Sequence, residues 1–305
     1  MKAGDWGRLL LLSLLWGGAF LFYKILDNAG LPPLTIVLGR VGLAALALIP
    51  VVRALGLAFP SRLSDWLPYA VLGITNNAVP FFLIASGETQ ISSGLASILN
   101  ATTPIFTAIV AHFATADERF SANKIAGIGL GFAGIVALVG PEAVGGLNIT
   151  SLAQIACLCA AISYAFAGVY GKRFRGTPLP VIATSQLIAS TLMLLPLELI
   201  LDKPWTLSVS WQTWLALLVM ALGGTAAAYI LYFGLIVSAG AVNASLVTLL
   251  VPVIALLLGG VFLHEHPAWT ALAGMALIFC GLAAIDGRVL ILVSFAAVRK
   301  AKVWH

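Results

Sequence analysis

Hydrophobic side chains fill long stretches of this chain, and most of the charged residues fall in the connectors between them. A bilayer core about 30 Å thick is crossed by roughly 20 apolar residues in a helix, which satisfies its own backbone hydrogen bonds. Ten stretches meet this requirement and predict transmembrane helices at 8–26, 34–52, 66–85, 92–115, 122–139, 151–172, 178–201, 211–235, 242–264 and 268–286. Because most connectors are short, neighbouring helices are expected to run antiparallel in an all-α membrane protein.

The composition agrees with this pattern. Of the 305 residues, 61% are hydrophobic and 9% are charged, against roughly 25% charged in soluble domains. The net charge of +5 is spread over the connectors rather than gathered in one patch, so the expected surroundings are a lipid bilayer and not nucleic acid. The three cysteines lie inside apolar stretches, which predicts neither a disulfide framework nor a metal site, and no cofactor is expected.

The basic residues also predict the orientation in the membrane. With the N-terminus inside, thirteen of the sixteen Lys and Arg residues fall on the cytoplasmic side, two fall outside, and Arg40 lies within the second span. Positive residues collect on the cytoplasmic face, so we expect a multi-pass inner-membrane protein with both termini in the cytoplasm. Residues 288–305 are then a basic cytoplasmic tail. The first apolar stretch continues without a small-residue cleavage site, which favours a span over a signal peptide.

A shift of 147 to 148 residues lays the second half of the chain on the first. The residues that recur are Glu118, Gly127 and Gly134 as Glu265, Gly274 and Gly281, and Pro104 as Pro252. Five spans per repeat is an odd number, so the second copy enters the membrane from the opposite side. We therefore predict two inverted five-helix repeats at 1–140 and 141–287, an arrangement that lets transporters rock around one central site.

At these residues the chain resembles the EamA-type exporters of the drug/metabolite transporter superfamily. The resemblance covers roughly 8–286 and rests on LLWGGA at 14–19, GGVFLHE at 259–265 and the duplicated proline, glutamate and glycines. It implies a ten-helix exporter of metabolites such as amino acids, and the aromatic residues make the chain similar to aromatic amino acid exporters. One departure is that Asp117 and Glu118 stand where the second repeat has His264, Glu265 and His266.

The candidate substrate site consists of polar and aromatic residues at helical spacing deep within the spans. They are Trp16, Phe20, Asn76, Asn77, Phe81, Asn100, Tyr164, Thr225, Tyr229, Tyr232 and Thr248. The rings would stack on an aromatic or bulky apolar substrate, while the amides and hydroxyls pair with its amino and carboxyl ends. The alternative for Ser and Thr is bonding to their own helix or to a neighbouring one. Pro104 and Pro252 can bend their helices and free a carbonyl.

Arg40 allows three interpretations. It can snorkel to the outer interface, pair structurally with Glu88 or Glu198, or form an outer gate that opens when such a contact breaks. No Asp or Glu lies near the middle of a predicted span, which favours facilitated export by alternating access over coupling through a carboxylate and protons. The run from His264 to His266 has no third clustered partner, so it predicts a capped helix end rather than a metal site.

Other functions remain open at this stage. The substrate of an exporter can instead be a nucleoside or a drug. A membrane-embedded enzyme needs a nucleophile with a base, or paired acids, at one depth, and the sequence shows neither, so we predict that the protein is not an enzyme. A non-transporting membrane subunit would lack a central cavity between the halves. A monomer is compatible with the sequence, which does not set the oligomeric state.

Overall fold

The computed structural model describes residues 2–114, 121–139, 149–239, 244 and 246–286, and all regular elements within them are helical. The α-helices of the first half are α1 (Ala3–Asn28), α2 (Pro33–Ala54), α3 (Leu67–Gly73), α4 (Val79–Glu88), α5 (Ser93–Asn100), α6 (Thr103–Ala114) and α7 (Ala122–Val139). Those of the second half are α8 (Ile149–Tyr170), α9 (Leu179–Leu201), α10 (Trp211–Ala221), α11 (Ala228–Ala239), α13 (Val247–Leu263) and α14 (Trp269–Asp286). Short turns of 3-10 helix are η1 (Leu63–Trp66), η4 (Gly171–Phe174) and η5 (Pro204–Thr206), and π-helical turns are η2 (Ile74–Ala78) and η6 (Leu222–Ala227).

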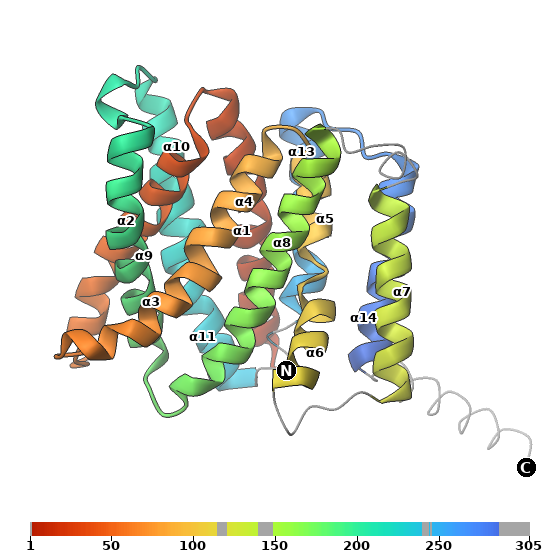
Figure 1. Cartoon of the computed structure of the whole chain (residues 1–305), viewed down its shortest axis with the longest axis horizontal. Helices are drawn as coiled ribbons and strands as arrows, with labels where there is room; N and C mark the ends of the chain where they lie inside the picture. The colour runs from red at the N-terminus through yellow and green to blue at the C-terminus, as the bar shows by residue number, and fades with distance from the viewer. Residues whose placement is uncertain (1, 115–120, 140–148, 240–243, 245, 287–305) are drawn as a thin grey trace, which may run out of the picture.

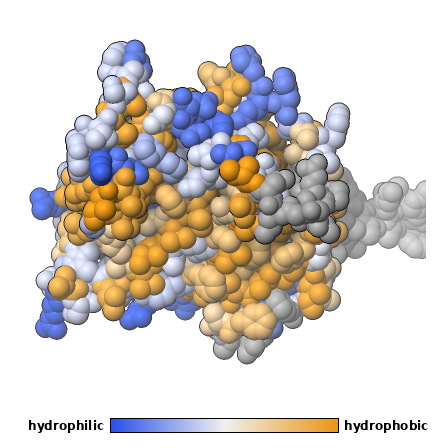
Figure 2. Space-filling model, turned by 45° about the horizontal axis from the view of Figure 1, so that its top comes forward, coloured by the Kyte–Doolittle hydropathy of each residue, from blue (hydrophilic) through white to orange (hydrophobic). Residues whose placement is uncertain are grey.

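The helices have the length and composition of membrane spans. Within the described residues, seven helical segments are long and apolar enough to cross a bilayer, and three shorter apolar helices are Ala122–Ala137, Val247–Leu263 and Trp269–Ile285. Each of the ten predicted stretches overlaps one of these segments. Figure 2 shows hydrophobic side chains over the middle of the molecule and hydrophilic ones gathered toward its top and bottom. The predicted tail at 288–305 lies outside the described residues.

Helices α7 and α14 lie side by side at one end of the bundle (Figure 1). A Cβ atom at Gly127 would lie 2.5 Å from the carbonyl oxygen of Gly281, and one at Gly134 would lie 2.8 Å from that of Gly274. The repeat makes Gly127 equivalent to Gly274 and Gly134 equivalent to Gly281. The contact between Gly127 and Gly281 is therefore equivalent to the contact between Gly274 and Gly134. Reciprocal contacts of this kind are produced by a two-fold axis. The structure therefore has the expected two-repeat architecture, with both glycine pairs needed for close backbone approach.

The fourth span is broken, whereas α13, the described part of its counterpart in the second half, has no break at the equivalent place. Helix α5 ends at Asn100 and α6 begins at Thr103. Pro104 has no N–H to donate, and the carbonyl oxygen of Asn100 accepts a hydrogen bond from Thr103 Oγ1 at 2.7 Å instead. The helix is thus interrupted just before Pro104, where only a bend was expected, while α13 runs through Pro252 from Val247 to Leu263 without a break.

The two π-helical turns occupy equivalent places in the repeats, since η2 begins at Ile74 and η6 at Leu222, 148 residues later. Carbonyl groups at such turns are available to partners outside the helix. Ser190 on α9 donates from Oγ to the carbonyl oxygen of Gly73 at 3.0 Å, and Ser163 on α8 donates to that of Thr75 at 2.8 Å. Side chains of the second half therefore fix the irregular turn of the first.

Candidate functional site

Arg40, on α2, is buried with 5% of its surface exposed. Its Nε donates to Thr225 Oγ1 at 2.8 Å and its Nη1 donates to the hydroxyl of Tyr23 at 2.7 Å. A longer bond of 3.4 Å runs from Nη2 to the carbonyl oxygen of Gly224, in the turn η6. The guanidinium carbon lies 3.8 Å from the ring centroid of Phe81. The result is a positive charge held inside the bundle by neutral acceptors and an aromatic face.

Two of the interpretations of Arg40 therefore need correction. The side chain does not snorkel to the interface, because Thr225 and Tyr23 hold its guanidinium inside the bundle. It also makes no ion pair with Glu88 or Glu198 among the described residues, and Glu198 Oε1 instead accepts from Thr35 Oγ1 at 3.3 Å. The third interpretation, a gate contact formed in another conformation, stays a prediction.

A second polar group lies between η2, α9 and α11. Tyr229 donates from its hydroxyl to Asn77 Oδ1 at 3.0 Å, and Asn77 Nδ2 donates to Ser190 Oγ at 3.3 Å. Asn76 Nδ2 donates to Gln186 Oε1 at 3.0 Å and to the Tyr229 hydroxyl at 3.4 Å. Residues from both halves thus satisfy one another's amide and hydroxyl groups. We call these two polar groups together, with Phe81 and Tyr164, the Arg40 cluster.

Aromatic rings extend the Arg40 cluster on two sides. Phe81 and Tyr164 lie edge to face with their centroids 6.5 Å apart. Tyr229 stacks on Phe233 at 5.8 Å, and Phe233 lies 6.1 Å from Tyr232. Tyr232 in turn packs 5.3 Å from Trp16 of α1. Trp16, Tyr164, Tyr229 and Tyr232 all pack against the hydrophobic core and are partly exposed.

Three other predicted site residues occupy different places in the fold. Phe20 is buried in the hydrophobic core, and Asn100 ends α5 with its Oδ1 lacking a donor among the described residues. Thr248 lies in the first turn of α13. Ser97 and Thr107 donate to carbonyl oxygens of their own helices, which is the alternative expected for Ser and Thr residues.

Sequence reasoning missed Tyr23, Gln186 and Ser190. Tyr23 continues the spacing of Trp16 and Phe20 along α1, at i, i+4 and i+7, so its place on the same face was available from the sequence. Gln186 and Ser190 are four residues apart in an otherwise apolar span, which is the spacing of neighbours on one helix face. Their partners lie more than 100 residues away, and no local pattern reveals such pairs.

Helices α3 and α9 meet in a tight seam beside the Arg40 cluster. A Cβ atom at Gly73 would lie 2.8 Å from both the carbonyl oxygen of Gln186 and Oγ of Ser190. A pocket of about 610 Å³ lies at the adjoining helix ends and is lined by Tyr69, Arg173 and Val181, among others. The tight contact at Gly73 lies between this pocket and the Arg40 cluster. On α3, the pocket residue Tyr69 precedes Gly73 by one helical turn, and on α9, the pocket residue Val181 precedes Gln186 by little more than one turn.

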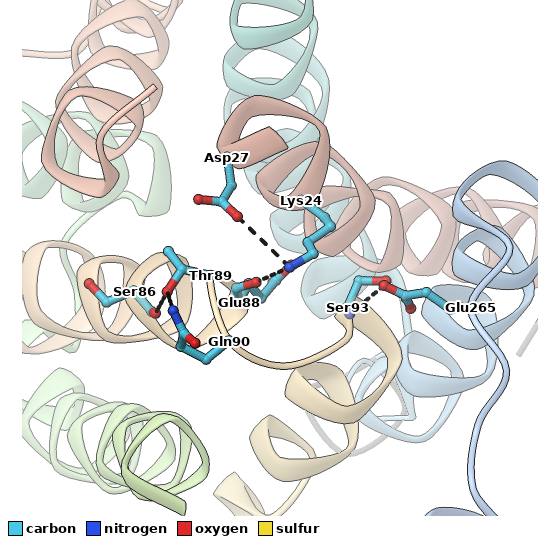
Figure 3. A network of polar contacts seen from close by, with 8 residues as sticks. All are labelled: Lys24, Asp27, Ser86, Glu88, Thr89, Gln90, Ser93 and Glu265. Atoms are coloured by element: carbon cyan, nitrogen blue, oxygen red, sulfur yellow. Dashed lines mark hydrogen bonds and ion pairs between the residues drawn. The ribbon is translucent and has the colours of Figure 1, made fainter. Parts of the chain in front are cut away.

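Glu265 connects the two halves at the other face of the bundle (Figure 3). Its carboxylate accepts hydrogen bonds from the backbone N–H of Ser93 at 2.9 Å, from Ser93 Oγ at 2.8 Å and from the N–H of Gly94 at 3.3 Å. It thereby caps the N-terminus of α5. The predicted capping role is confirmed, with the capped helix in the other half. The described residues contain no group of three or more His, Cys, Asp and Glu suited to a metal ion.

Comparisons with known proteins agree with this architecture. The sequence model of the EamA-like transporter family matches the chain twice, at residues 7–140 and 151–285. An uncharacterized transporter of Bacillus subtilis, YoaV, is 26% identical over 88% of this chain and 92% of its own length. The uncharacterized inner membrane transporter YedA of Escherichia coli K12 is 29% identical over 83% of this chain and 81% of its own.

Two further matches bear on function and on fold. A probable terminal-alkyne amino-acid exporter of Streptantibioticus cattleyicolor is 30% identical over 92% of this chain and 93% of its own. A solved crystal structure with 19% sequence identity superposes with a TM-score of 0.65, covering 93% of this chain and 96% of the other. At that identity the second match shows a shared fold alone.

Proposed function

Because the chain belongs to the EamA-like transporter family, we propose that it exports amino acids with aromatic or bulky apolar side chains by alternating access between its two halves. The observation that carries this proposal is the Arg40 cluster, where a buried cation, amide and hydroxyl groups and partly exposed rings come together. A zwitterion with an aromatic side chain complements each of these groups.

The chemistry of the Arg40 cluster suits such a substrate. Arg40 has five N–H donors and uses three of them, so N–H groups remain for a carboxylate. Gln186 Oε1 and the Tyr229 hydroxyl are acceptors for an ammonium group. The faces of Tyr229 and Tyr164 would hold the side chain by stacking. The match to the probable terminal-alkyne amino-acid exporter of Streptantibioticus supports an amino acid as the substrate.

The seam between α3 and α9 supports alternating access. In this conformation Gly73 packs against Gln186 and Ser190, which separates the pocket beside Tyr69 from the Arg40 cluster. Parting α3 from α9 would open a path from this pocket to the Arg40 cluster and thus from one side of the membrane. The distribution of Lys and Arg places that side in the cytoplasm, with both termini, and the inner membrane is the proposed location.

The coupling of transport to an ion needs a separate account. The absence of a carboxylate near the middle of a span favours facilitated transport, as the sequence predicts. The structure, however, buries the carboxyl group of Glu88 at the end of α4.

The proposal is tested with purified protein in liposomes and labelled phenylalanine, leucine and alanine. The variant Phe81→Ala removes the ring under Arg40, and Phe82→Ala makes the same change on a neighbouring ring that is 41% exposed. We expect phenylalanine transport by the wild type, about 30-fold weaker transport by the first variant, given a desolvated cation–π contact of about 2 kcal/mol, and no change in the second.

Two other outcomes would redirect the assignment. Equal loss in both variants would mean that the Phe81 ring supports folding rather than binding. Transport of nucleosides or cationic drugs, with none of any amino acid, would overturn the substrate class while leaving the family membership intact. Phenylalaninamide, which lacks the carboxylate, should be transported poorly by the wild type. Equal transport of phenylalanine and phenylalaninamide would mean that Arg40 does not bind the substrate carboxylate.

A further inference from the structure

Glu88, the last residue of α4, is fully buried, with 0% of its surface exposed. Neither carboxyl oxygen has a hydrogen-bond partner among the described residues. The amino group of Lys24 reaches the backbone carbonyl oxygen of Glu88 rather than its side chain, and lies 3.8 Å from the carboxylate of Asp27 (Figure 3). The side chain is therefore buried next to a cation whose contacts are made elsewhere.

The charges around Glu88 come from several packed elements. The titratable and charged groups near it are Tyr23, Lys24 and Asp27 on α1, Arg40 on α2, Cys157 on α8 and Glu265 after α13. The two cations are balanced in number by two other carboxylates. Each charged group also has its own contact, since Lys24 is paired with Asp27, Arg40 bonds Tyr23 and Thr225, and Glu265 caps α5. Among the described residues, neither cation donates a hydrogen bond to the carboxylate of Glu88.

A buried carboxylate without donors is one of the least favourable groups in a protein. Transfer of an ionised carboxyl group from water costs several kcal/mol even after relaxation, and such a group takes up a proton instead. Removing the charge leaves a neutral carboxyl group, for which burial costs far less. The geometry thus favours a Glu88 that carries a proton in this conformation.

We propose that Glu88 is a proton-binding site that is loaded and emptied during each transport cycle, so that substrate movement is coupled to protons. The proposal rests on the transport function proposed above and departs from facilitated transport. The proton is held while α1 and α4 are packed as they are here. It leaves for water when the outer ends of α1 and α4 part, or when Lys24 turns from Asp27 to the carboxylate that remains.

The location of Glu88 explains how sequence reasoning passed over it. Coupling carboxylates are sought near the middle of a span, and Glu88 lies at the end of one. Here burial comes from packing, because Gly87 is so close to α8 that a Cβ atom there would lie 2.7 Å from Cys157 Sγ. Glu88 is consequently fully buried although it lies at the end of the span.

The first experiment measures phenylalanine counterflow and proton movement in liposomes that contain a trapped pH indicator, between about pH 5.5 and 8.5. Glu88→Gln keeps the shape of the side chain and cannot ionise. The matched control is Glu198→Gln, which changes a carboxyl group that is 2% exposed and has a hydrogen bond from Thr35.

We expect wild-type counterflow to change severalfold over this range and a phenylalanine gradient to move protons. Glu88→Gln should retain counterflow, lose its pH dependence and move no protons, while Glu198→Gln should behave as the wild type. The proposal is overturned if Glu88→Gln keeps the pH dependence and the proton movement, or if the wild type shows neither.

A second measurement does not depend on the substrate. A protonated carboxyl group has a C=O stretching band in the infrared spectrum, so the detergent-solubilised wild type at neutral pH should show a band that Glu88→Gln lacks and Glu198→Gln retains. If Glu88→Gln does not fold, Glu88→Asp takes its place, and its carboxyl band should be shifted from that of the wild type. A spectrum without a band assignable to Glu88 would refute the proton site even if phenylalanine is transported. A band in a protein that does not transport phenylalanine would support the proton site at Glu88 and refute phenylalanine as the substrate.

Discussion

Replacing Glu265 by alanine removes the group that ties the α13–α14 connection to the N-terminus of α5. Three donors, two from Ser93 and one from Gly94, then lose their acceptor. Because Ser93 is fully buried, water replaces the carboxylate poorly. The variant should therefore destabilise the contact between the two halves and not only the local turn.

The size of the effect follows from the contacts. A hydrogen bond to a charged group contributes about 1.5–3 kcal/mol, and loss of an N-terminal cap costs about 1 kcal/mol. Since Glu265 is itself partly accessible, we expect a total loss of about 2–4 kcal/mol rather than the sum over all three bonds. Ser93→Ala removes one donor, and its effect should be smaller and strongly coupled to that of Glu265→Ala.

The assay is thermal unfolding of the purified variants in detergent, with His266→Ala as the control at an exposed neighbouring position. A double-mutant cycle of Glu265→Ala and Ser93→Ala should give a coupling energy of about 1 kcal/mol or more. Equal melting temperatures of Glu265→Ala and His266→Ala, or additive effects in the cycle, would refute the capping argument. Gly259→Ala offers an independent check, since its Cβ would lie 2.5 Å from Glu265 Oε2 and displace the carboxylate.

Two further variants test the packing and the site. Gly134→Ala should lower the melting temperature by several degrees because its Cβ would meet the carbonyl oxygen of Gly274 at 2.8 Å, whereas Gly129→Ala on the same helix meets nothing within 4 Å and should be neutral. Tyr229→Phe removes the donor to Asn77 and should weaken phenylalanine transport about 3- to 10-fold while leaving expression unchanged; wild-type transport in this variant would place the hydroxyl outside the substrate path.

The hydrophobic pattern was sufficient to predict where the apolar helices lie, because each span is a long run of apolar residues. The repeat was predictable too, because glycines at close backbone contacts, such as Gly127 and Gly281, have equivalents at the same spacing in the other half. A bend was expected at both Pro104 and Pro252, but the helix is interrupted before Pro104 and continues through Pro252. A proline removes one donor, and the surroundings decide whether the helix continues.

The partners of buried polar groups could not be read in the same way. For Arg40 the sequence left snorkelling, structural pairing and a gate open, because it gave only the distance of Arg40 from the end of its span. Its partners Thr225 and Gly224 lie 185 and 184 residues away, and they meet it only after the halves assemble. Glu88 was passed over for the related reason that depth along a helix does not measure burial.

The two π-helical turns sit at matching places, but they are not surrounded alike. Arg40 lies where the second repeat has Ile188, and Gln186 lies where the first has Leu38. In an alternating-access transporter with two identical halves, the inward- and outward-facing conformations would be related by the two-fold axis and equal in energy. Each half of this chain instead has one polar side chain where the other half has an aliphatic one, and this difference removes the equality. If the protein works as proposed, a few unmatched side chains set its resting direction, and the duplicated scaffold does not.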